Sequence, residues 1–126
     1  MKHSDWTVRE KPYDLRARLF LFAGLIVRIV QFLHTRGPIA AALSYQLLSA
    51  GTSAGANYEE ADSGSSPSDT LAKRKIVLRE LKETSFRLRL LRQAGYLSAE
   101  HDPVIQEAAE LTKIVAKVIR NSIPCD

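Results

Sequence analysis

Five side chains at helical spacing between residues 75 and 89 are the strongest candidates for chemistry in this sequence. They are Lys75, Arg79, Lys82, Phe86 and Arg89, and we call them the basic stripe. Residues three and four apart share one face of an α-helix, so four cations and a ring align. Cations neutralise phosphates and an exposed ring can stack on a base, as a surface that follows a nucleic-acid backbone requires. The alternative interpretation is a solvated helix face, with lysine and arginine stems covering the edge of a core.

The charge around the stripe is only partly balanced. Glu80 and Glu83 lie to one side, where they can pair with Lys73 and Arg87. The whole chain of 126 residues carries a net charge of +4, which permits nucleic acid or an acidic partner without requiring either. A symmetric oligomer would repeat the stripe and sum its field, which would favour nucleic-acid binding.

Other polar residues give no pattern typical of an enzyme. The histidines are scattered and lack the i, i+4 or Glu-x-x-His spacing of metal sites in helical bundles; they are His3, His34 and His101. Glu59 and Glu60 are adjacent and point apart on a helix, whereas acid–base catalysis needs convergent groups. The single cysteine, Cys125, has no histidine near it in sequence. We therefore expect no catalysis, no metal and no cofactor.

Four helices are expected to position the stripe. The apolar periodicity predicts helices over about residues 15–35, 38–61, 67–94 and 102–120. Asp14 and Ser66 are expected helix caps, Pro38 and Pro67 suit first helical positions, and Gly95 suits a helix stop. Short links favour antiparallel neighbours. The predicted fold is all-α, an antiparallel up-down-up-down four-helix bundle over residues 14–121, with a flexible arm at 1–13 and a tail at 122–126.

The second helix is rich in small residues. Gly51 and Gly55 lie on one face, beside Ala50 and Ala54. Each mid-helix glycine costs about 1 kcal/mol relative to alanine, and close approach of another helix would offset that cost. We therefore predict tight helix packing here, with a core face that begins at Ile39. A phosphate-binding loop is the weaker alternative, because no lysine follows at the required spacing and no strand precedes.

The first helix is apolar nearly all round. One face carries Leu19, Phe22, Ile26, Ile29, Val30 and Leu33. A second face has four candidate oligomer-interface residues, Phe20, Leu25, Val27 and Phe32. In a small bundle only one face meets the core, so this pattern predicts a homo-oligomer. The alternative is the central helix of a monomer. Trp6 could pack back onto the body or remain an exposed aromatic.

No signal peptide is evident at the N-terminus. The apolar run 19–33 is interrupted by Arg28 and Gln31 and is shorter than the about 20 residues that span a bilayer. From the sequence we expect a cytoplasmic protein with no membrane segment.

The chain resembles a family through several motifs. They are DLRAR at 14–18, SAGTSAGANYEEAD at 49–62, KRKIVLRELKET at 73–84 and EAAEL at 107–111. These resemble the small bacterial four-helix bundle proteins named for an intervening sequence in 23S ribosomal RNA. That family is similar to the accessory protein of diversity-generating retroelements, a five-fold ring with a basic surface that binds nucleic acid and a reverse transcriptase.

The resemblance implies a non-enzymatic homo-oligomer, such as a pentameric ring, with RNA, DNA or a reverse transcriptase as partners. Many family members have a basic residue at the position of Ser49. Its absence here weakens a nucleic-acid role for the second helix and leaves the basic stripe as the candidate surface. The alternative function is an oligomeric protein-interaction or structural module that binds no nucleic acid.

Overall fold

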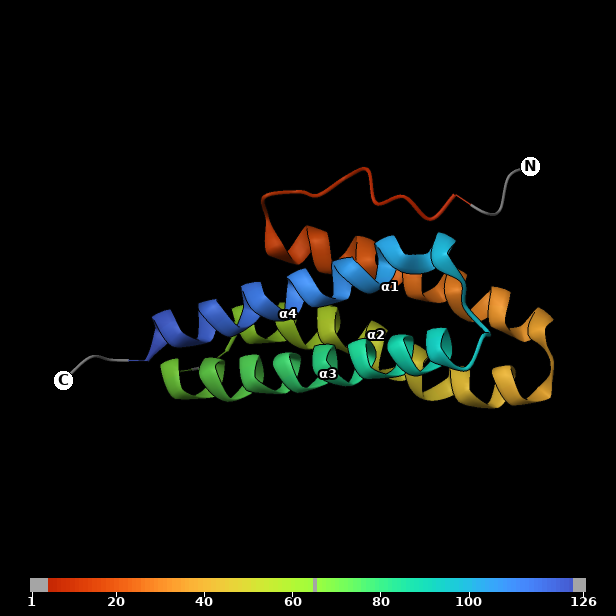
Figure 1. The fold of residues 1–126 in the computed structure, drawn as a ribbon. Helices are drawn as coiled ribbons and strands as arrows, with labels where there is room; N and C mark the ends of the chain where they lie inside the picture. Colours follow the sequence, from red (N-terminus) through yellow and green to blue (C-terminus); the bar gives the residue numbers. More distant parts are fainter. Residues whose placement is uncertain (1–4, 65, 124–126) are drawn as a thin grey trace.

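The computed structural model describes residues 5–64 and 66–123, so His3 and Cys125 lie outside the described residues. Four long helices make up most of this part: α1 Leu15–Leu33, α2 Pro38–Asp62, α3 Pro67–Gln93 and α4 Asp102–Ser122. Two short 3₁₀ turns adjoin these helices. The turn η1 His34–Arg36 follows α1, and the turn η2 Ala99–His101 precedes α4. Consecutive helices run in opposite directions (Figure 1). The described chain contains no strand, so the predicted helical fold is confirmed.

The helix boundaries follow from local capping chemistry. The Asp14 carboxylate accepts a hydrogen bond from the Arg16 backbone N–H at 3.2 Å. The Ser66 hydroxyl accepts one from the Asp69 N–H at 3.1 Å, with Pro67 in the first turn. Such bonds satisfy donors that a helix start leaves free. Gly37 and Gly95 have φ angles of 104° and 86°, which explains glycine at both helix exits.

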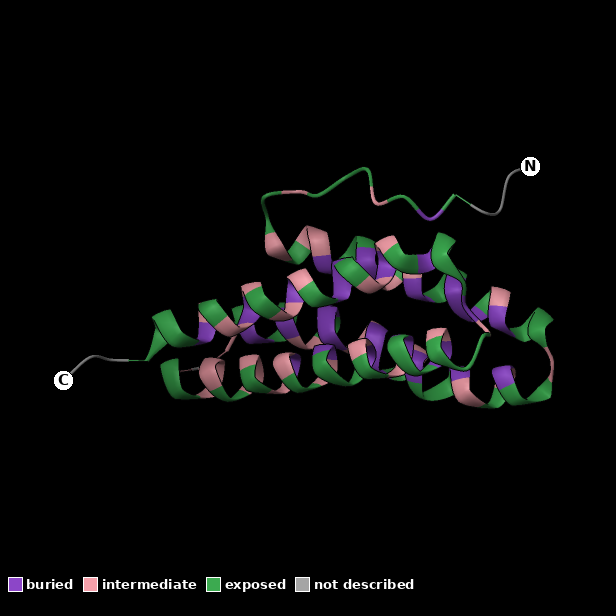
Figure 2. Ribbon diagram, in the orientation of Figure 1, coloured by how far each residue is buried: buried purple, intermediate pink, exposed green. Residues whose placement is uncertain are grey.

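Each helix turns one face toward a common core (Figure 2). The six residues predicted for the inner face of α1 are all buried: Leu19, Phe22, Ile26, Ile29, Val30 and Leu33. On α2 the expected starting point is wrong, because Ile39 is exposed and the buried face begins with Ala40 and Ser44. The later members of that face, Leu47, Ala50 and Ala54, are buried.

The two glycines of α2 face α1. A Cβ built on Gly51 would lie 2.7 Å and 2.8 Å from the γ carbons of Ile26. A Cβ on Gly55 would instead lie 3.5 Å from the Leu19 carbonyl oxygen, an ordinary contact. Close approach of α1 therefore requires a glycine at position 51, whereas position 55 has room for one more methyl group.

The described part of the N-terminal arm is attached to the bundle. Trp6 is 4% exposed and packs against Phe32 and His101, with ring centroids 6.5 Å and 5.1 Å away. At the other end, the Lys11 ammonium lies 3.3 Å from a Glu110 carboxylate oxygen of α4. Of the two interpretations of Trp6, packing onto the body is confirmed. Residues 5–13, the described part of the predicted arm, thus lie along the bundle, and we call them the strap.

Within residues 5–64 and 66–123, one helical segment is long and apolar enough to cross a membrane by length and composition alone. Leu15–Arg36 has a mean hydropathy of 1.6 in its most apolar window, so the argument that the run is too short is wrong. A third of that window is buried inside the bundle, and Arg18 within the segment is paired with carboxylates of α4. The core helix of a helical bundle has these same properties.

Candidate nucleic-acid interface

The basic stripe lies on the outer face of α3. The opposite face of this helix is buried through Val77, Leu81, Thr84, Leu88 and Leu91. The five stripe residues are spaced by four and three positions, so they share the helix face opposite the buried one. All five are exposed. The Arg79 side chain is 72% exposed and Phe86 is 52% exposed.

Most of the positive charge on the stripe has no acidic partner. Arg79 lies 3.7 Å from Glu80, a contact with a well-exposed guanidinium. The Arg89 guanidinium lies over the Phe86 ring, 5.9 Å from its centroid. Among residues 5–64 and 66–123, no ion pair involves Lys75, Lys82 or Arg89. The stripe therefore offers three uncompensated cations and an accessible ring.

The acidic neighbour Glu80 contacts α2 as well as Arg79 of the stripe. Glu80 accepts a hydrogen bond from the Ser53 hydroxyl of α2 at 3.1 Å. Lys73 binds Asp69 at 3.1 Å and lies 3.5 Å from Glu60, so the expected pairing of Lys73 with Glu80 is wrong. The hydrogen bond that the Lys73 ammonium donates to the Asp69 carboxylate, and the negative charge of that carboxylate, raise the pKa of Lys73.

The second predicted pair is present. Arg87 lies 3.7 Å from Glu83, one turn earlier on α3. This i, i+4 pair removes one carboxylate and one cation from the surface beside the stripe without touching its members.

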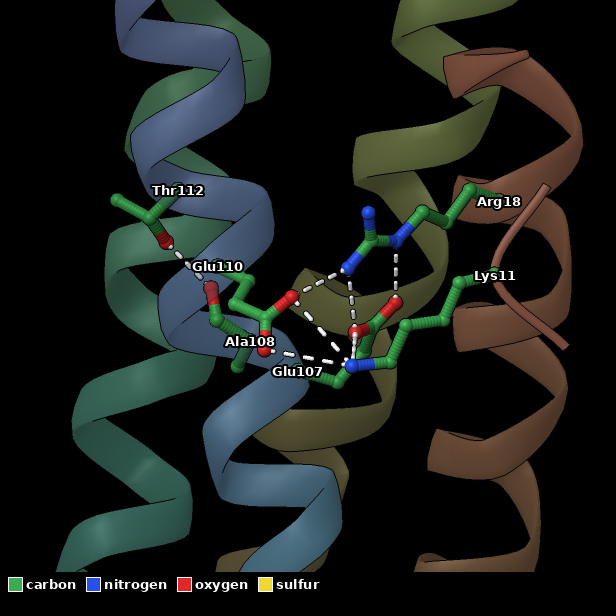
Figure 3. Close-up of polar contacts among 6 residues, drawn as sticks. All are labelled: Lys11, Arg18, Glu107, Ala108, Glu110 and Thr112. Atoms are coloured by element: carbon green, nitrogen blue, oxygen red, sulfur yellow. Dashed lines mark hydrogen bonds and ion pairs between the residues drawn. The ribbon is translucent and has the colours of Figure 1, made fainter. Parts of the chain in front are cut away.

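A partly buried ionic cluster joins α1, α4 and the strap (Figure 3). The Arg18 guanidinium donates two hydrogen bonds to Glu107, at 2.7 Å and 2.8 Å, and a third to Glu110 at 2.8 Å. Glu107 is 2% exposed, and Lys11 also reaches Glu110. Hydrogen bonds from Arg18 and Lys11 hold the pKa of Glu110 below its usual value. Such bidentate geometry is what makes a buried carboxylate tolerable.

Sequence reasoning missed this cluster. Arg18 and Glu107 are 89 positions apart, so no local spacing links them. The available signal was Glu107 at a position three residues after Val104, inside the apolar face of a helix. A charged residue on a core face needs a partner of opposite charge, and the cations of the first helix, Arg16, Arg18 and Arg28, were the candidates.

His101 is buried between aromatic rings. Its ring centroid lies 4.8 Å from Phe32 and 5.1 Å from Trp6. Nδ1 accepts a hydrogen bond from the Ser98 backbone N–H, whereas Nε2 has no partner among the described residues. Burial lowers the pKa of His101. Within the described chain, no group of three His, Cys, Asp or Glu side chains is placed to hold a metal ion.

The four candidate interface residues of α1 divide into two pairs. Phe20 is 70% exposed and Val27 is 40% exposed. Leu25 and Phe32 are partly buried; Phe32 contacts Trp6 of the strap, and Leu25 lies beneath the strap. The chain's own arm therefore covers part of the second apolar face, which the sequence assigned entirely to another subunit.

Comparison with known proteins found similarity to a solved structure. No protein-family model and no curated protein matches the chain. The chain is similar to a protein of the S23 ribosomal protein family. That protein, from Bacteroides thetaiotaomicron, has unknown function and a crystal structure that superposes with a TM-score of 0.77 at 29% sequence identity. The match covers 84% of this chain and 98% of the other.

This similarity supports the predicted relationship to a family of small helical proteins. It extends over nearly all of the related protein, so the whole bundle and not a single helical hairpin is shared. The link to retroelement accessory proteins stays a prediction.

Proposed function

We propose that this chain is a non-enzymatic helical-bundle protein that binds RNA or DNA through the basic stripe of α3. The observation that supports the proposal is the exposure of all five stripe residues, three of whose cations have no acidic partner in the described chain. A surface of this kind binds phosphates through charge and does not read base edges. We therefore expect little sequence preference.

The dimensions of the stripe suit an extended strand. From Lys75 to Arg89 the helix rises about 21 Å, at 1.5 Å per residue. Cations recur along this length, and Phe86 lies among them. An aromatic ring placed between phosphate contacts favours single strands, because only unpaired bases expose a face for stacking. The Arg89 guanidinium against Phe86 can extend this platform, since arginine also stacks on bases.

A salt titration tests the proposal. We expect binding of single-stranded RNA or DNA to weaken linearly with the logarithm of salt concentration, because each neutralised phosphate releases counterions. Phe86→Ala should weaken single-strand binding by about 1–3 kcal/mol and leave the salt slope unchanged, because the ring carries no charge. Absence of any binding at low salt would refute the proposal and favour an interaction module without nucleic acid.

We also propose that copies of the chain associate through the exposed part of α1. Phe20 and Val27 lie on a different face of α1 from the core residues, and both side chains are exposed in the single chain. Large exposed apolar side chains on a monomer mark interaction sites when they cluster. A closed ring, such as a pentamer, would repeat the stripe around the assembly. Light scattering should report a multiple of 14.0 kDa, and Phe20→Glu should shift the mass toward that of the monomer.

A further inference from the structure

A cavity of about 320 Å³ lies between the strap and α1. Residues 7–10 of the strap form one wall, and α1 forms the other with Leu21, Phe22, Gly24, Leu25 and Arg28. The strap is fixed at both ends, by Trp6 in its aromatic contact and by Lys11 on Glu110. Between these anchors it spans the cavity without filling it. The volume falls at the lower end of the range of about 300–1,000 Å³ that is typical of small-ligand sites.

Gly24 has no structural partner that explains a glycine. A Cβ built at this position would meet nothing within 4 Å, whereas a Cβ on Gly51 would strike Ile26. A mid-helix glycine lowers helix stability relative to alanine, and Gly24 obtains no close helix contact in return. Its missing side chain instead widens the cavity. The lack of a side chain at position 24 leaves space that a bound ligand could occupy.

The polar groups around the cavity define the charge of that occupant. Two carboxylates line the cavity, Glu107, which Arg18 binds, and Glu10 of the strap. Of the cations, Arg18 is saturated by Glu107 and Glu110, and Arg9 binds Asp5 at 2.7 Å. Arg28 differs from both.

The Arg28 guanidinium lies over the Trp6 ring at 4.7 Å and donates to the Asp5 backbone oxygen at 3.3 Å. No carboxylate pairs with it in the described chain. A guanidinium has five N–H donors in a planar fork that matches a carboxylate, so donors remain for a ligand.

We propose that this cavity is a binding site for a small apolar carboxylate. The hydrocarbon part would lie over Gly24, against Leu21 and Leu25, and the carboxylate would bind Arg28. This site is separate from the basic stripe, so it can be present or absent independently of nucleic-acid binding. Trp6 is the only tryptophan of the chain and contacts Arg28, which provides an intrinsic fluorescent reporter.

Titration with octanoate and its neutral analogue 1-octanol tests the site. The wild type should bind octanoate saturably, with a change in Trp6 fluorescence, and bind octanol roughly tenfold more weakly, as expected for loss of one charged hydrogen-bonding group. Arg28→Gln should remove this preference, and Arg28→Lys should restore part of it. Circular dichroism of each variant reports whether the helices remain intact.

Two substitutions at Gly24 separate ligand binding from helix stability. Gly24→Ala raises helix propensity but leaves most of the cavity open, so octanoate binding should persist. Gly24→Leu raises propensity similarly and fills the cavity, so binding should be lost. Equal octanoate binding by the alanine and leucine variants, equal binding of octanoate and octanol by the wild type, or no saturable binding at all would overturn the proposal.

Discussion

Two alanine substitutions in α2 should differ in their effects on the free energy of unfolding. In Gly51→Ala the new methyl group would lie 2.7 Å and 2.8 Å from the γ carbons of Ile26, well inside the about 3.5–4.0 Å of a favourable carbon contact. Ile26 is fully buried, and its β-branched side chain has few alternative rotamers. In Gly55→Ala the nearest atom is the Leu19 carbonyl oxygen at 3.5 Å, so no neighbour must move.

The matched pair isolates the packing energy. Both substitutions gain about 1 kcal/mol of helix propensity, so this gain cancels when the two variants are compared. Overpacking costs about 1–3 kcal/mol, and only Gly51→Ala should incur it. We expect Gly55→Ala to raise the free energy of unfolding by about 1 kcal/mol and Gly51→Ala to lie about 1–3 kcal/mol below it. Urea denaturation followed by circular dichroism measures both. Equal stability of the two variants would refute the close approach of α1 at Gly51.

Two further predictions concern the strap and its anchors. Glu107→Ala should lower the free energy of unfolding by about 3–5 kcal/mol, because it breaks a buried ion pair. Glu110→Ala, at a half-exposed position, should lower it by about 0–1 kcal/mol. Similar losses for the two variants in urea denaturation would contradict the difference in burial. Burial lowers the pKa of His101, so its contribution to stability should be complete above its usual pKa of 6.5 and decline as the pH falls through the lowered value. Unfolding monitored by Trp6 fluorescence should show this acid dependence in the wild type, and His101→Gln should lack it.

The helical fold was predictable because its determinants are local. Apolar spacing, Asp14 and Ser66 as caps, and glycine at helix exits each act within a few residues, and the structure has all of them. The exposed face of α3 was also predictable, since helical periodicity alone decides which residues lie opposite a leucine-rich core. Periodicity failed at Ile39, because the side of the first turn of α2 that meets the core carries Ala40, which is fully buried, and Ile39 lies off that side.

The arm and the ionic cluster were not predictable in the same way. Nothing in the local sequence of residues 5–13 indicates where Trp6 binds, because its partners Phe32 and His101 come from distant elements. The strap covers part of the apolar face of α1 from which the sequence predicted an oligomer. Of the four candidate interface residues, Phe20 and Val27 are the two that remain exposed for self-association.

The motifs behind the family resemblance meet in space. DLRAR and EAAEL contact each other through Arg18 and Glu107, and the motifs of α2 and α3 contact through Ser53 and Glu80. These polar contacts hold helices together. The resemblance therefore includes contacts that assemble the bundle. Lys75, Arg79 and Lys82 lie within the α3 motif but take no part in those two contacts.

The central claim is that the basic stripe contacts nucleic acid, and a comparison of two charge-matched variants tests it most directly. The first variant changes three cations of the stripe to glutamine, Lys75, Arg79 and Lys82. The control changes three exposed cations of α4 in the same way, Lys113, Lys117 and Arg120. Both variants lose the same net charge, so a general electrostatic effect would weaken binding equally. We expect the stripe variant to bind single-stranded RNA more weakly than the control and with a flatter salt slope. Equal affinities and equal slopes for the two variants would contradict the claim.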